Sequence, residues 1–138
     1  MTIRSARPGD ADVLAALLGE LGHPATRAEV VERLGRTDAR DPVFVAESED
    51  TVIGLIALHL GPQFQRARPV ARIVALVVAE PHRGRNWGLR LVQHAVELAR
   101  ERGCGMVELT SRLEREAAHG FYEAAGFSKT SHRFSRDL

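Results

Sequence analysis

The sequence is poor in cysteine, because Cys104 is the single cysteine among 138 residues. One cysteine cannot form a disulfide within the chain, and residues 1–4 do not begin an apolar stretch of the signal-peptide kind. Both absences favour a reducing compartment, so we expect a cytoplasmic protein. Cys104 stands between two glycines with no neighbouring His or Lys, which predicts a small structural thiol and no nucleophile.

Long hydrophobic runs and an excess of one charge are absent as well. The longest apolar runs, residues 52–60 and 73–79, are far shorter than the ~20 residues that a membrane-spanning helix needs. Lys and Arg total 19 against 18 Asp and Glu, which gives a formal net charge of +1. This balance offers no reason to expect a nucleic acid or an anionic membrane as partner. We therefore expect a soluble protein whose partners are set by local sites.

The apolar pattern indicates one domain over residues 1–138, because no internal repeat, low-complexity stretch or long linker interrupts it. Two helix starts carry capping signals: Asp10 follows a Pro-Gly turn, and Thr26 has Glu29 three residues later. β-branched runs predict strands, and the continuous apolar run over residues 73–78 predicts a central strand buried on both faces.

These signals together predict a mixed α/β (α+β) fold of three layers, in the order β-α-α-β-β-β-α-β-α-β. The predicted elements, in chain order, are a strand over residues 2–6, a helix capped by Asp10, a helix capped by Thr26, strands over residues 43–46, 52–58 and 73–78, a helix from Leu89, a strand over residues 106–110, a helix over residues 114–124 and a final strand or strand pair over residues 127–134.

Residues 77–92 carry the densest functional signal, an apolar strand that leads into a basic turn with glycines and then into a helix. Unpaired backbone N–H groups at a helix start, the positive end of the helix dipole and small residues together favour binding of a pyrophosphate. Arg83 and Arg85 add positive charge that could reach a ribose phosphate. The turn is therefore a predicted anion site.

Two familiar phosphate-binding motifs do not fit this turn. A P-loop needs Gly-Lys followed by Ser or Thr, which the turn does not contain. A dinucleotide fingerprint needs G-x-G-x-x-G, whereas the glycines here are Gly84 and Gly88. Glu108 resembles the ribose-binding acid of that fold in its spacing, but the preceding order of elements is wrong for it. We interpret that match as chance.

The segment Arg83-Gly84-Arg85-Asn86-Trp87-Gly88 resembles the CoA-binding motif of the GNAT superfamily, which reads Gln or Arg, two residues, Gly, one residue, and Gly or Ala. One residue departs from the motif, because Asn86 stands where the family has its first glycine. Asn tolerates the left-handed backbone conformation better than other non-glycine residues, so the turn is expected to keep its shape.

A second segment, residues 118–127, is similar to the helix-to-strand motif of the same family, with an aromatic-Tyr-acid sequence and a closing Gly-Phe. It follows the first motif at the family's distance of one strand and one helix. Arg115 differs, because many members have an asparagine there. With the helix start near Asp10 and the element order, the resemblance covers essentially the whole chain. It implies a central, mostly antiparallel sheet that is splayed at the cofactor site.

The resemblance further implies that the chain transfers the acetyl group of acetyl-CoA to a primary amine by direct attack in a ternary complex. Tyr122 occupies the position of the family's general acid for the departing CoA thiolate. A backbone N–H would polarise the thioester carbonyl where the strand at residues 76–78 separates from residues 108–110. The implied cofactor-binding residues are Leu76, Val77, Val78, Arg83, Gly84, Arg85, Asn86, Trp87, Gly88 and Leu89.

The general base is not assigned by the sequence. Many family members have a glutamate on the strand before the cofactor turn, whereas residues 71–76 contain no carboxylate. His59, Glu108 and His119 are titratable groups that could face the cleft. A water chain that relays the proton to solvent is an equally good alternative.

The acceptor is an unidentified small-molecule or peptide amine. In the family, the two N-terminal helices and the loop over residues 61–69 wall the acceptor side, and here that loop carries Gln63, Arg66 and Arg68. Its arginines could favour an acidic acceptor, although a solvated loop explains them as well. Three alternatives stay open: a longer acyl-CoA accommodated near residues 109–111, a non-catalytic CoA sensor, and, more distantly, a nucleic-acid-binding domain. A homodimer is also open.

Overall fold

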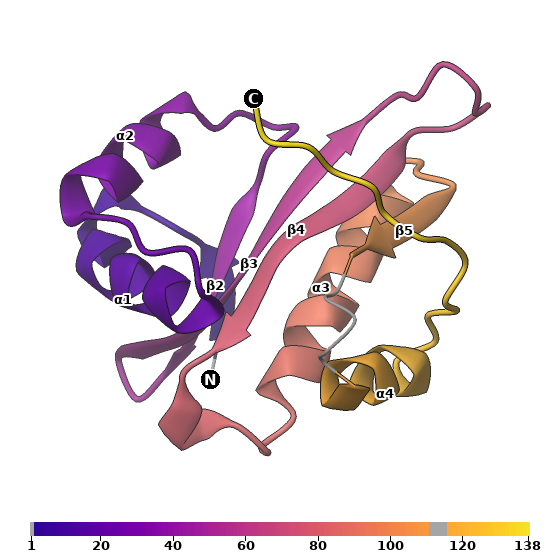
Figure 1. Cartoon of the computed structure of the whole chain (residues 1–138). Coiled ribbons are helices and arrows are strands. Elements are labelled where there is room, and N and C mark those ends of the chain that lie inside the picture. Colours follow the sequence, from indigo (N-terminus) through magenta and orange to yellow (C-terminus); the bar gives the residue numbers. More distant parts are fainter. Residues whose placement is uncertain (1, 111–115) are drawn as a thin grey trace. The chain divides into compact units, whose positions relative to one another are not determined.

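The structure, a computed structural model, describes residues 2–110 and 116–138 (Figure 1). The chain divides into two compact units, a first unit up to Glu108 and a second unit from Leu109 onward, and each is described by itself. The elements are β1 (Thr2–Ser5), the one-turn 3-10 helix η1 (Pro8–Asp10), α1 (Ala11–Leu21), α2 (Arg27–Arg36), β2 (Val43–Ser48), β3 (Thr51–Gly61), β4 (Val70–Val78), the 3-10 helix η2 (Glu80–His82), α3 (Trp87–Glu101), β5 (Met106–Leu109) and α4 (Glu116–Ala124).

The sheet has the strand order β1-β2-β3-β4-β5, and its first four strands pair antiparallel with their neighbours in sequence. β5 runs parallel to β4, because two contacts join them at the same separation of 36 residues. In one, the Gly105 N–H donates to the Pro69 carbonyl at 2.9 Å, and in the other Arg72 donates to Glu108 at 3.3 Å. The intervening helix α3 supplies the crossover that parallel strands need.

Helices cover both faces of β2, β3 and β4 (Figure 1). On one face, α1 and α2 bury apolar side chains against Val45, Leu55 and Val77. On the other face, α3 approaches β3 at Gly54, where an added Cβ would lie 3.3 Å from Leu91 Cδ1. Burial of both faces explains why these strands are almost continuously apolar. The buried core residues of the helices are Ala11, Leu14, Leu17, Val30, Trp87, Leu91, Val92, Ala95 and Ala99.

Of the two predicted side-chain caps, the one at α2 is present and the one at α1 is not. Thr26 and Glu29 form the expected capping box, in which Thr26 Oγ1 accepts from the Glu29 N–H at 3.1 Å and Glu29 Oε1 accepts from the Thr26 N–H at 3.0 Å. Asp10 does precede α1, but its side chain does not cap that helix. Its carboxylate instead accepts from the Arg7 N–H and from both terminal nitrogens of Arg4, each at 2.9 Å.

The second unit contains α4, and residues 127–138 after it form neither helix nor strand. The predicted final strand over residues 127–134 is therefore wrong. The segment is mostly polar and exposed, and Phe134 has a relative exposure of 94%. A strand needs a hydrogen-bonding neighbour and usually one apolar face to bury, and this segment offers no such face.

No helix within residues 2–110 and 116–138 combines the length and the apolar character needed to cross a membrane. The remaining predicted elements of the first unit are present with small shifts of their ends. The helix predicted over residues 114–124 is described from Glu116. The organisation as one domain stays a prediction.

Candidate active site

The turn between β4 and α3 has the backbone shape that an anion site requires. Gly84 has φ +80° and Asn86 has φ +64°, so both are left-handed. Asn86 therefore adopts the conformation expected from its place in the motif, although it carries a side chain. Glycine reaches this region freely and Asn reaches it more readily than most residues, which explains both identities.

The start of α3 leaves backbone donors available. The helix begins at Trp87, and the Arg90 N–H makes its bond to the Asn86 carbonyl at 3.0 Å. Asn86 makes no side-chain cap hydrogen bond. The N–H groups of the first turn, including those of Gly88 and Leu89, therefore lack helical acceptors and lie at the positive end of the dipole.

Trp87 anchors this turn to the first unit. Its side chain is buried, at 5% exposure, and the guanidinium carbon of Arg90 lies 4.9 Å from the ring centroid. Within the described residues, Arg90 Nη1 is buried without a hydrogen-bond partner. The arginine thus contributes a cation and a spare donor beside the helix start.

Arg83 and Arg85 behave differently from each other. Arg83 Nε donates to the Val78 carbonyl at 2.9 Å, and its Nη2 pairs with Glu20 of α1 at 3.2 Å. The same Glu20 oxygen accepts from the Glu80 N–H at 3.0 Å. Arg83 therefore ties the end of β4 to α1, whereas Arg85 is exposed. A contact of either residue with a phosphate stays a prediction.

The end of β4 combines core packing with an extended backbone edge. Val77 is buried in the core at 6% exposure, while Leu76 and Val78 are half-buried. β5 ends one residue after Glu108, whereas β4 continues well past Arg72 to Val78. Among residues 2–110, the last part of β4 therefore extends beyond the end of β5, and an extended ligand could pair with it. The expected separation of the two strands stays a prediction.

A β-bulge interrupts β4 in its middle. The register passes from Ala57 opposite Ala75 to Leu58 opposite Ile73, so Val74 has no partner on β3. Val74 is 56% exposed, although the apolar run predicted burial on both faces. That expectation is wrong at this residue, because the extra residue of a bulge is pushed out of the ladder. A continuous apolar run contains no signal for such a bulge.

Four charged or titratable side chains form a polar row at the N-terminal end of β4: Asp41, His59, Arg72 and Glu108. His59 and Arg72 are register partners on β3 and β4. His59 Nδ1 lies 2.5 Å from Asp41 Oδ1, and Arg72 Nη1 lies 3.3 Å from Glu108 Oε1. Gln63 Nε2 also approaches Glu108 Oε1, at 3.5 Å.

The polar row joins two of the predicted candidate bases with two residues that the sequence did not single out for this chemistry. Asp41 and His59 are 18 residues apart, and Arg72 and Glu108 are 36 apart. Strand pairing brings them together, and no local motif marks that pairing. The third candidate, His119, is half-buried on α4 of the second unit. Arg115 lies outside the described residues.

A hollow of about 510 Å³ lies at the same end of β4. Arg68 packs against Gly105 in its lining, because a Cβ added at Gly105 would be 3.2 Å from Arg68 Cβ. Arg66 and Arg68 give the hollow a positive character, and both come from the loop expected to wall the acceptor side. The lining residues are Gln65, Arg66, Ala67, Arg68, Pro69, Val70, Gly105 and Met106.

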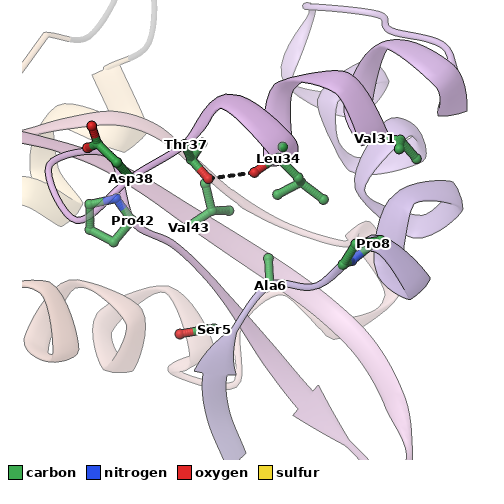
Figure 2. Close-up of a pocket in the computed structure, with 10 residues that line it drawn as sticks. Ser5, Ala6, Pro8, Val31, Leu34, Thr37, Asp38, Pro42 and Val43 are labelled. Atoms are coloured by element: carbon green, nitrogen blue, oxygen red, sulfur yellow. Dashed lines mark hydrogen bonds between the residues drawn. The ribbon is translucent and has the colours of Figure 1, made fainter.

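A second hollow of about 410 Å³ lies between α2 and the neighbouring ends of β1 and β2 (Figure 2). Thr37 closes the end of α2 there by donating to the Leu34 carbonyl at 2.8 Å. β3 separates β2 from β4 in the sheet, so this hollow is distinct from both ends of β4. Its lining residues are Ser5, Ala6, Pro8, Val31, Leu34, Gly35, Thr37, Asp38, Pro42 and Val43.

Tyr122 is held by the way α4 ends. The Phe127 N–H donates to the Tyr122 carbonyl and the Gly126 N–H to the Glu123 carbonyl, each at 3.0 Å. Gly126 has φ +96°, so the helix closes in a Schellman motif. The Tyr122 ring packs edge-on against Phe121 and Phe127, with centroids 5.3 and 6.0 Å away. The Gly-Phe pair of the second motif therefore fixes the orientation of the tyrosine.

Cys104 follows the last turn of α3 and is half-buried. Burial raises the pKa of its thiol, because the thiolate loses solvation, while the Arg102 charge opposes that effect more weakly. Since the thiolate is the reactive form, this environment agrees with a structural thiol.

Comparisons with known proteins agree with this geometry. The Acetyltransferase (GNAT) family matches residues 12–127. The aminoalkylphosphonate N-acetyltransferase of Salmonella typhimurium is 31% identical, over 99% of this chain and 90% of its own length. The glucosamine 6-phosphate N-acetyltransferase of Trypanosoma brucei brucei is 30% identical, over 80% of this chain and 74% of its own. A solved Trypanosoma brucei acetyltransferase superposes with a TM-score of 0.85 at 27% identity, covering 99% of each chain. The mixed α/β fold is thus that of GNAT structures.

Proposed function

Because the chain belongs to the GNAT family of acetyltransferases, we propose that it transfers the acetyl group of acetyl-CoA to the primary amine of a small acceptor that carries an anionic group. The observation that carries the cofactor part is the turn before α3, where Asn86 is left-handed and no side chain caps the helix. The acceptor part is supported by the arginines of the hollow at the other end of β4. A cytoplasmic location belongs to the same proposal.

The residues around the turn fit the pyrophosphate of CoA. The first N–H groups of α3 supply directed donors, and the dipole of that helix favours an anion. Gly88 allows the backbone to approach the phosphates closely, and Arg85 and Arg90 add positive charge. An extended pantetheine arm would then pair with the backbone edge of β4 near Leu76 and Val78, which places the thioester toward the middle of the strand.

The chain's own residues can supply the proton that the leaving group needs. We assign this role to Tyr122, whose phenol would donate a proton to sulfur as the C–S bond breaks. The clamp from Phe121 and Phe127 keeps the ring in one orientation, which lowers the entropy that the transition state must lose. The bond that forms joins the acceptor nitrogen to the acetyl carbon.

The acceptor class rests on two independent observations. Two relatives are named for acceptors that carry both an amine and a phosphonate or a phosphate. The hollow at the N-terminal end of β4 presents Arg66 and Arg68, whose guanidinium groups suit such oxyanions in geometry and charge. An amine with an anionic group several bonds away could therefore be oriented by the hollow while its nitrogen points along β4.

A screen for release of free CoA tests the proposal. The wild-type protein is incubated with acetyl-CoA and pairs of amines that differ only in a phosphonate, phosphate or carboxylate group. We expect turnover of anionic amines, and we expect the double variant Arg66→Gln, Arg68→Gln to raise KM for them by about tenfold or more. The same variant should leave KM for a matched neutral amine within about twofold.

Other outcomes of the screen would contradict parts of the proposal. Tight CoA binding without acetylation of any amine would favour a CoA sensor. Faster turnover with succinyl-CoA than with acetyl-CoA would favour a longer acyl donor. Equal use of anionic and neutral amines, with no response to the double variant, would remove the acceptor class but leave the acetyl transfer in place.

A further inference from the structure

We infer that His59 is the general base that deprotonates the acceptor amine and that Asp41 positions its imidazole. This inference rests on the proposed function, since it names the proton acceptor of the same reaction. A primary amine is largely protonated at neutral pH, and an ammonium nitrogen has no lone pair with which to attack. Some group must therefore take that proton before the new bond forms.

The contact with Asp41 prepares the ring for this task. Asp41 Oδ1 lies 2.5 Å from His59 Nδ1, and the two residues come from different segments, the loop before β2 and the strand β3. A carboxylate at Nδ1 selects the form of the neutral ring in which Nδ1 carries the hydrogen and Nε2 carries the lone pair. The same carboxylate can keep accepting from Nδ1 after Nε2 has taken a proton.

The second ring nitrogen faces open space. A Cβ built at Gly61 would lie 3.8 Å from His59 Nε2, and Gly61 has no side chain to occupy that position. The imidazole is 56% exposed and Asp41 is 43% exposed. An acceptor amine can therefore reach Nε2 from solvent.

The place of His59 in the sheet brings it near the expected thioester. Its register partner on β4 is Arg72, so the two Cβ atoms are about 5 Å apart. Arg72 lies two residues, about 7 Å of strand, before the exposed bulge residue Val74. The span from His59 to the middle of β4 therefore matches the size of a small acceptor.

The charges around the ring favour His59 over Glu108. Besides Asp41, the charged neighbours in the polar row are Arg72 from β4 and, beyond it, Glu108 from β5. Glu108 Oε1 already accepts hydrogen bonds from Arg72 and Gln63, so that oxygen is less open to an incoming ammonium group. Arg72 can in turn hold the anionic group of an acceptor close to the hollow of Arg66 and Arg68.

The proton balance closes with this assignment. His59 Nε2 takes one proton from the ammonium group, and the freed nitrogen bonds to the acetyl carbon. The C–S bond breaks, its electron pair leaves with sulfur, and sulfur takes the proton of Tyr122. The second proton lost by the nitrogen restores Tyr122 through solvent, and the proton on His59 leaves to bulk water. One proton is released for each acetyl group transferred.

The test is the pH profile of kcat/KM for the best acceptor of the amine screen, from about pH 6 to about pH 9. We expect His59→Gln to lower kcat/KM about a hundredfold near neutral pH while KM for acetyl-CoA stays within about twofold. The deficit should shrink as the pH rises, because the acceptor then loses its proton to solvent without help. Asp41→Asn should lower kcat/KM by about tenfold and shift the profile, and Asp41→Glu should restore part of the rate.

Two control variants distinguish the loss of a catalytic group from the general effect of changing an exposed side chain. His132→Gln alters an exposed histidine of the second unit, and Asp12→Asn alters an exposed ion pair with Arg27. Both should leave the profile in place. His59→Gln or Asp41→Asn with a wild-type profile would overturn the inference, and so would loss of the ascending limb in His119→Gln alone. A wild type that acetylates no amine would overturn the proposed function and this inference together.

Discussion

The two ends of β4 would bind their ligands with different kinds of chemical group. The C-terminal end leads into the turn at residues 83–88, where backbone N–H groups and a helix dipole form the predicted anion site. The N-terminal end has the polar row and the arginines of the hollow, where side chains from distant segments meet. A backbone site suits a cosubstrate that every family member shares, and a side-chain site suits an acceptor that differs between members.

The largest effect is expected from Gly88→Asp, which places a negative charge in the predicted anion site at the C-terminal end of β4. The new carboxylate would lie against the pyrophosphate, so we expect the affinity for acetyl-CoA to fall about a hundredfold or more in calorimetry. Gly19→Asp is the matched control, because Gly19 is exposed on α1 with nothing within 4 Å of an added Cβ. Undiminished affinity in a folded Gly88→Asp protein would remove the cofactor from this turn.

A slightly smaller effect is expected from Tyr122→Phe, which leaves both ends of β4 unchanged. The loss of the phenol should lower kcat by about 10- to 1,000-fold with little change in KM for acetyl-CoA, because the proton is needed mainly in the transition state. Steady-state kinetics with the best acceptor measure this. Phe121→Leu is the control for packing around the ring. A wild-type kcat in Tyr122→Phe would leave the tyrosine as a core aromatic.

A moderate effect, on stability alone, is expected from Asp10→Asn. The hydrogen bonds from Arg4 lower the pKa of the Asp10 carboxyl, although burial opposes them. A folded pKa below the unfolded one stabilises the protein above about pH 4, and the gain is lost as the pH falls through the lowered value. The variant should unfold about 1–3 kcal/mol more easily near pH 7.

The pH dependence of that difference is the control. Urea denaturation at a series of pH values below about 4 should bring wild type and Asp10→Asn closer together, because the folded carboxylate loses its charge as the pH falls through its lowered pKa. KM values for both substrates should stay unchanged at ordinary temperature, since the pair touches neither end of β4. A difference in stability that persists at low pH would show that the side chain acts through its shape.

The smallest effect is expected from Asn86→Gly. Glycine adopts the left-handed conformation freely, and Asn86 makes no cap hydrogen bond that would be lost. The dissociation constant of acetyl-CoA should therefore stay within about twofold of the wild-type value. A large loss of affinity would show that the amide side chain of Asn86 contacts the cofactor. Cofactor binding at the C-terminal end of β4 would then depend on a side chain as well as on backbone groups.

The contrast between the two ends also explains what the sequence could predict. A left-handed turn restricts the residues that can occupy it, so Gly84 and Asn86 are visible as a local pattern. The capping box of α2 is local for the same reason. The contact of Asp41 with His59 depends on strand register, which no short motif encodes. The bulge at Val74 was missed because an apolar run looks the same with or without an extra residue.

The end of the chain shows where the pattern of residue types did not predict the structure. The sequence pattern predicts a strand over residues 127–134, yet the segment has little apolar surface to bury. The Gly126-Phe127 pair that seemed to lead into that strand instead closes α4 and clamps Tyr122. The glycine and the phenylalanine are therefore explained by the end of a helix and not by the start of a strand.

The most direct test of the central claim is a titration of the isotope-labelled protein with acetyl-CoA, followed by the backbone amide signals in NMR. The account predicts that the amides of Gly84, Gly88 and Leu89 shift and saturate together, because their N–H groups would face the pyrophosphate. It also predicts that an anionic amine added afterwards shifts Arg66, Arg68 and the His59 ring. Saturation of acetyl-CoA binding with the amides of the turn unmoved would contradict the account.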